Sequence, residues 1–188
     1  MAIPDGAEPF VVDDAQAWRA WLELNEHASQ GVWLVLAKKG TTSPTSLTYA
    51  DALDHALCSG WIDGQKRSLD EATFLQRFTP RRARSLWSAR NVDHIARLTD
   101  CGLMRPRGLD EVSKAKVDGR WDRAYPGSRT ATVPDDLAAA LDASPLLRAR
   151  FDALGSQARF SVLHPLMTAP NPETRARRLA KILATLEA

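Results

Sequence analysis

The chain has 188 residues, of which 44% are hydrophobic and 26% are charged, and its formal net charge is +2. This length suits one domain, or one domain with a helical extension, and the composition is typical of a globular protein rather than a disordered or fibrous one. The N-terminal segment MAIPDGAEPFVVDDAQ lacks both a basic start and an apolar run. The sequence therefore predicts no secretory signal, no membrane span and a cytoplasmic location.

Helix and strand patterns alternate in the first part of the chain. Residues 10–12 can form an edge strand or pack as a tail, and residues 14–27 are expected to form a helix capped by an aspartate. Residues 31–39 are apolar on both faces, which indicates a central strand. Residues 48–60 have a capping threonine, a helical apolar stripe and a terminal glycine, so they predict a second helix.

Two strand patterns follow, at residues 61–66 and 73–79, and the turn-rich segment SLDEA joins them. They predict an antiparallel hairpin. Strict alternation places Trp61, Asp63 and Gln65 on one face of the first strand. A flat indole wall beside polar side chains is what a small polar ligand needs, so this face is a candidate binding site.

The rest of the chain reads as helical. Helices are expected at 88–101 and 108–117, and the turn residues of 126–134 indicate a linker. Four more helices are predicted at 135–143, 145–154, 156–168 and 172–188. The fold class is therefore α+β: a small, mainly antiparallel sheet packed with helices, followed by a C-terminal helical bundle. The expected domains are 1–125 and 135–188, which could also pack as one unit.

Five arginines and no acid occur within residues 76–90, where a strand turns into a helix. Guanidinium groups and the free N–H groups of a helix N-terminus both favour anions. The predicted ligand-binding residues are Lys38, Trp61, Asp63, Gln65, Arg77, Arg81, Arg82, Trp87 and Asn91. The alternative is that Asp63 and Arg77 form an ion pair under Trp61 that only ties the sheet together.

Two other functions compete with ligand binding. The first is a hydrolase-like or detoxifying enzyme, with Asp63 as acid or base and Arg77 stabilising negative charge. The second is a nucleic-acid binder that uses the arginine run, although only one tryptophan interleaves with it. Asp51, His55 and Cys58 share a helix face and raise a nucleophile hypothesis, for which a solvated helix face is the simpler interpretation.

Metal and cofactor sites find no support in the sequence. The four histidines lack ligand spacing, and the two cysteines form neither a CxxC motif nor a disulfide framework. Nucleotide-binding and serine-hydrolase motifs are absent from the sequence, so no cofactor is predicted and the catalytic residues are unknown.

Several segments together resemble the bacterial YdeI/OmpD-associated, or bacteriocin-protection, family. They are AWRAWLELNEHASQGVWLVLAKKG, LTYADALDHALCSGWIDGQ, FLQRFTPRRARSLWSARN, GLMRPRGLDEVSKAKVDGRWD and NPETRARRLAKILATLEA. The resemblance spans nearly the whole chain and keeps the order of the segments. It implies a cytoplasmic α+β protein with a helical C-terminal region, linked by name to protection against bacteriocins, and it transfers no reaction. The expected function is a stress or resistance protein that binds a small polar or anionic ligand.

Overall fold

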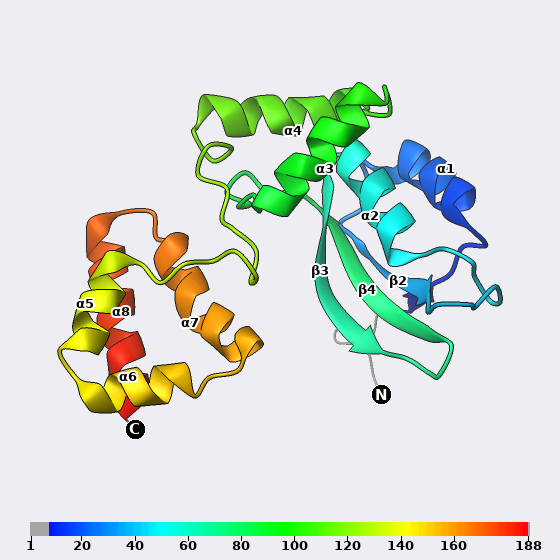
Figure 1. Ribbon diagram of the computed structural model, residues 1–188. Helices are drawn as coiled ribbons and strands as arrows, with labels where there is room; N and C mark the ends of the chain where they lie inside the picture. The colour runs from blue at the N-terminus through cyan, green and yellow to red at the C-terminus, as the bar shows by residue number, and fades with distance from the viewer. Residues whose placement is uncertain (1–7, 188) are drawn as a thin grey trace. The chain divides into compact units, whose positions relative to one another are not determined.

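The computed structural model describes residues 8–187 and divides the chain into two compact units (Figure 1). The first unit combines the chain up to Ser85 with Asn91–Asp122, and the second combines Leu86–Arg90 with the chain from Arg123 onward. The sequence placed the boundary in 126–134, whereas the contacts divide the chain just before Arg123. The short segment Leu86–Arg90 joins the second unit because the backbone of Tyr125 pairs with it.

A four-stranded mixed sheet forms the centre of the first unit, in the order β1-β2-β4-β3. Its strands are β1 (Pro9–Phe10), β2 (Val32–Ala37), β3 (Trp61–Ser68) and β4 (Thr73–Pro80). The edge strand β1 is parallel to β2, while β4 pairs antiparallel with both β2 and β3. The predicted α+β class and the predicted hairpin are thereby confirmed. Of residues 10–12, which the sequence left open between an edge strand and a tail, only Phe10 lies in the edge strand β1.

Four helices accompany this sheet: α1 (Ala15–Asn25), α2 (Tyr49–Cys58), α3 (Ala89–Asp100) and α4 (Pro106–Val117). The side chains of Asp14 and Thr48 cap α1 and α2 by accepting hydrogen bonds from backbone N–H groups. The Thr48 hydroxyl also donates to the Asp51 carboxylate at 2.6 Å, which links the two side chains across the first turn of α2. Both caps begin their helices where the sequence predicted.

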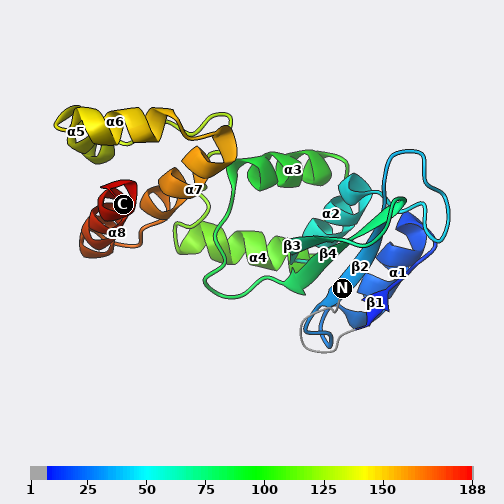
Figure 2. The ribbon, with the colours of Figure 1, turned by 90° about the horizontal axis from the view of Figure 1, so that it is seen from below.

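The helices α1 and α2 lie beside the sheet (Figure 2). An aromatic cluster holds them against one of its faces. Trp18 of α1 is fully buried and lies 5.7 Å from Phe78 of β4 and 6.4 Å from Trp61 of β3, measured between ring centroids. Its indole N–H donates to the backbone oxygen of Ala52 in α2 at 3.1 Å. Because burial of each aromatic ring contributes several kcal/mol at roughly 25 cal/mol per Å², this cluster is the main core of the first unit.

The second unit is a helical bundle with its own core. Its helices are α5 (Asp135–Asp142), α6 (Pro145–Asp152), α7 (Ser156–Met167) and α8 (Pro172–Glu187), all within a residue or two of the predicted bounds. The buried residues are Leu137, Leu141, Leu147, Phe151, Leu163, Leu166 and Leu186. These positions recur at helical spacing, so the bundle follows directly from the apolar pattern.

Candidate functional site

A β-bulge in β3 determines which side chains meet on the helix-covered face of the sheet. Asp63 pairs with Phe78, and Lys66 pairs with Gln76, so three steps along β3 match two steps along β4. One extra residue in a strand reverses the alternation of the side chains beyond it. Asp63 and Lys66 therefore point to the same face, which regular alternation would forbid.

Gln76 provides the hydrogen bonds that the bulge takes away from the ladder. Its side-chain amide donates to the backbone oxygen of Gly64 at 2.9 Å and to that of Gln65 at 3.3 Å. Gln76 is only 2% exposed, so its amide group bonds to these two carbonyls instead of to solvent. Gln76 thus stabilises the bulge, and the bulge positions Asp63 and Lys66 on one face.

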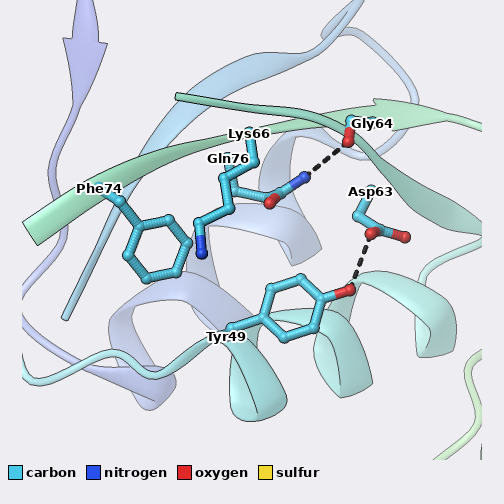
Figure 3. Close-up of a pocket in the computed structure, with 6 residues that line it drawn as sticks. All are labelled: Tyr49, Asp63, Gly64, Lys66, Phe74 and Gln76. Atoms are coloured by element: carbon cyan, nitrogen blue, oxygen red, sulfur yellow. Dashed lines mark hydrogen bonds between the residues drawn. The ribbon is translucent and has the colours of Figure 1, made fainter. Parts of the chain in front are cut away.

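A pocket of about 340 Å³ opens at this bulge, beside the start of α2 (Figure 3). Its lining residues come from α2, β3 and β4: Tyr49, Asp63, Gly64, Lys66, Phe74 and Gln76. The volume lies within the range of small-molecule sites. Two aromatic rings and two side chains of opposite charge share this one cavity.

The charged groups occupy separate places in the pocket. The Tyr49 hydroxyl donates to Oδ2 of Asp63 at 2.8 Å, which fixes that carboxylate. The Lys66 ammonium lies 4.1 Å from the centroid of the Phe74 ring, over its face (Figure 3). Within residues 8–187 neither Asp63 nor Lys66 forms an ion pair, so both charges remain available to a ligand.

Trp61 and Gln65 of β3 were predicted to bind the ligand, but neither of them lines the pocket. Trp61 is fully buried, and its indole N–H donates to the backbone oxygen of Glu26 at 3.3 Å. It stacks edge-on against Trp21 at 5.8 Å, so it belongs to the aromatic core. Gln65 is exposed and lies in the bulge, where Lys66 takes the place in the pocket that strict alternation gave to Gln65.

The structure separates Arg77 from Asp63. Asp63 pairs with Phe78, so these two side chains share a face of the sheet. Arg77 precedes Phe78 in β4 and therefore projects to the opposite face. Arg77 extends there toward Gly31, with its Nη2 atom 3.1 Å from where a Cβ of that residue would be. The prediction that Asp63 and Arg77 share one face is therefore wrong, and the two side chains form no ion pair within residues 8–187. The enzyme hypothesis stays a prediction.

The remaining cations lie away from the pocket lining. Lys38 is exposed, and its ammonium donates to the backbone oxygen of Asp70 at 2.6 Å, at the turn of the hairpin. Arg81 is 6% exposed and its backbone N–H donates to Gly60, whereas Arg82 is exposed on the following turn. These three cations therefore do not converge on one cavity with Asp63.

Trp87 and Asn91 are both buried and fall in different units. Trp87 lies in the segment that joins the second unit, where its backbone oxygen accepts from the N–H of Tyr125 at 3.0 Å. Asn91 begins the part of α3 that belongs to the first unit. Their assignment to a ligand site stays a prediction.

The helix face with Asp51, His55 and Cys58 does not form a nucleophile. Asp51 is engaged in the cap of α2, and Cys58 is only 4% exposed. Burial, with the nearby Asp54 carboxylate, raises the pKa of the Cys58 thiol to about 11, and burial also lowers the pKa of His55. A thiol with a raised pKa is a poor nucleophile, so Cys58 is a structural residue.

Five of the six residues that line the pocket were missing from the sequence prediction: Tyr49, Gly64, Lys66, Phe74 and Gln76. Lys66 was missed because the bulge was not recognised. The available signal was Gly64, since a glycine inside a strand pattern often marks a bulge. Recognising it would have moved Lys66 onto the face of Asp63.

Family models match two separate parts of the chain. Residues 10–111 match a domain of unknown function, DUF8412, and residues 130–188 match the model described as bacteriocin-protection, YdeI or OmpD-associated. The resemblance to the bacteriocin-protection family is confirmed for residues 130–188, in the second unit, whereas its expected extent over nearly the whole chain is wrong, because residues 10–111 match a different family. The chain matches no curated protein and no solved structure. No helix within the described residues is long and apolar enough to cross a membrane.

Proposed function

The chain belongs to the DUF8412 family and carries a bacteriocin-protection, YdeI or OmpD-associated domain at residues 130–188, and from this premise we propose that it is a cytoplasmic resistance protein that binds a small polar ligand. The ligand occupies the bulge pocket of the first unit, lined by Asp63 and Lys66. The observation that carries this proposal is that one cavity holds two aromatic rings and two opposite charges that form no ion pair within residues 8–187.

The ligand has an anionic group, a hydrogen-bond donor and a compact apolar body. Lys66 attracts the anionic group, and the oxygens of Asp63 accept from the donor. The rings of Tyr49 and Phe74 form the apolar walls. Since the carboxylate is already fixed by the Tyr49 hydroxyl, little ordering is needed when a ligand binds, and a preorganised site loses less free energy on binding.

Calorimetry with three related probes tests this assignment on the full chain. Leucine carries both charged groups, isocaproate carries only the carboxylate, and isoamylamine carries only the ammonium. We expect leucine to bind most tightly. Lys66→Gln weakens leucine and isocaproate about tenfold, and Asp63→Asn weakens leucine and isoamylamine by a similar factor, because a hydrogen bond to a charged group contributes about 1.5 kcal/mol or more.

The matched control is Lys39→Gln, which removes an exposed lysine of the same unit that does not line the pocket. This variant should bind all three probes as the wild type does. Absence of binding by every probe, or equal affinities in Lys66→Gln and the wild type, would rule out the proposed site.

A further inference from the structure

The helical second unit has a pocket of its own, of about 390 Å³, between α7 and α8. Its apolar walls are Val162 and Pro165 of α7, and Ile182 and Leu186 of α8. The volume is that of a small-molecule site and suits a short alkyl chain better than a helix of a partner protein. No part of the function proposed above uses this cavity.

The two hydroxyl groups that line the pocket are occupied by their own helices. The Ser161 hydroxyl donates to the backbone oxygen of Gln157 at 3.0 Å, and the Thr185 hydroxyl donates to that of Lys181 at 2.9 Å. When a hydroxyl donates to the preceding helical turn, the carbon atoms of its side chain are the part that faces the cavity. The walls are therefore more apolar than their composition alone suggests.

Two cations remain at the rim. Arg178 donates through Nη1 to the backbone oxygen of Pro165 at 2.7 Å, which fixes the guanidinium beside α7. Its other N–H groups are not used by that bond. Lys181 is exposed and, within residues 8–187, forms no ion pair, and no acidic residue lines this pocket. An apolar cavity with a purely cationic rim complements an apolar ligand with a negative end.

We propose that the pocket between α7 and α8 binds a single-chain amphiphile with an anionic head group. The alkyl chain lies along the apolar walls, where its burial drives binding, and the head group meets Arg178 and Lys181. This site is independent of the pocket at Asp63 and Lys66, because the two share no residue and belong to different units.

Calorimetry on the full chain with three decyl probes tests the proposal. Decanoate is anionic, decyltrimethylammonium is cationic and decyl maltoside is neutral, and each is used below the concentration at which it aggregates. Decanoate should bind with one site per chain and at least about tenfold more tightly than the other two, because only its head group pairs with the rim. Equal affinities for the three probes, or no binding of decanoate, would overturn the proposal.

Two variants locate the site. Lys181→Gln should weaken decanoate binding about fivefold to tenfold and leave decyl maltoside unchanged, since it removes a charge and no wall. Thr185→Phe should abolish binding of every probe by filling the cavity. Arg177→Gln is the matched control, because Arg177 is an exposed cation of α8 that does not line the pocket. If Lys181→Gln and Thr185→Phe both bind decanoate like Arg177→Gln, decanoate binds elsewhere and the assignment fails.

Discussion

Asp63 and Lys66 lie on the same face of β3, because the bulge between them matches three residues of β3 to two residues of β4. Without the extra residue, one of the two side chains would point to the opposite face of the sheet. The bulge therefore brings a carboxylate and an ammonium into one pocket, from a strand that would otherwise divide them.

The hydrogen bonds of Gln76 lead to the first prediction. Gln76→Met keeps the approximate volume but removes the donors to the oxygens of Gly64 and Gln65. The loss of these two hydrogen bonds should lower the free energy of unfolding by about 1–3 kcal/mol and weaken leucine binding. Urea denaturation measures the first effect and calorimetry the second. A variant as stable as the wild type, with unchanged affinity, would show that the bulge does not need this side chain.

Gly108 of α4 allows a sharp test of how α4 packs on α2. A Cβ at this position would lie 2.2 Å from the backbone oxygen of Cys58. Gly→Ala in a helix usually stabilises by about 1 kcal/mol, whereas here the clash with rigid backbone should reverse the sign and destabilise by about 1–3 kcal/mol. Gly127→Ala is the control, since nothing lies within 4 Å of its Cβ position. Thermal unfolding compares the stability of both variants with that of the wild type. A Gly108→Ala variant more stable than the wild type would disprove this close contact.

The two cysteines should differ in reactivity. Burial raises the pKa of the Cys58 thiol to about 11, while Cys101 is exposed. At about pH 8 almost no thiolate forms at Cys58, so iodoacetamide should label one thiol per native chain and two after denaturation. Mass spectrometry identifies the site. Rapid labelling of Cys58 in the native chain would contradict its burial.

The raised pKa of the Cys58 thiol also makes stability depend on pH. The stability that the protonated thiol provides is complete below pH 9 and is lost as the pH rises toward 11.

A bidentate ion pair connects α5 and α8. Arg175 donates through Nε and Nη2 to the two Asp136 oxygens, at 2.7 Å each, and these hydrogen bonds lower the pKa of Asp136 below its ordinary value of 3.8. The pair therefore stabilises the fold fully above about pH 4, and this contribution is lost as the pH falls through the lowered pKa. We expect Asp136→Asn to destabilise by about 1 kcal/mol at neutral pH, because the pair is one-third exposed, and by less at about pH 2.5.

The control for this pair is Asp152→Asn, which affects a looser contact with Arg159 at 3.7 Å in the same unit. It should change the free energy of unfolding by less than about 0.5 kcal/mol at either pH. If Asp136→Asn destabilises equally at both pH values, its effect arises from packing rather than from charge.

The sequence predicts the helices and strands well, because the apolar periodicity is regular and the caps are strong. Thr48 and Asp14 begin α2 and α1 as expected, and the leucines of the second unit recur at helical spacing. The candidate site is harder to predict, because it depends on one irregularity at Gly64. A bulge shifts every side chain beyond it to the other face, so the strand was predicted correctly but Gln65, rather than Lys66, was placed on the face of Asp63.

Burial explains the other differences. Trp61 and Arg81 were expected to contact a ligand, yet both are nearly inaccessible to solvent. Alternation along a strand tells which residues share a face, but it does not tell which face the helices cover. The aromatic side chains of α1 cover Trp61, and this long-range contact has no signature in the local pattern of β3.

The most direct test of the bulge pocket is a titration of the isotope-labelled full chain with leucine, followed by backbone NMR. The account predicts saturable shifts concentrated at Gly64, Lys66 and Gln76, and their loss in Lys66→Gln. Shifts confined to other parts of the chain, or no saturable shift at these three residues, would contradict the claim that this pocket binds a small polar ligand.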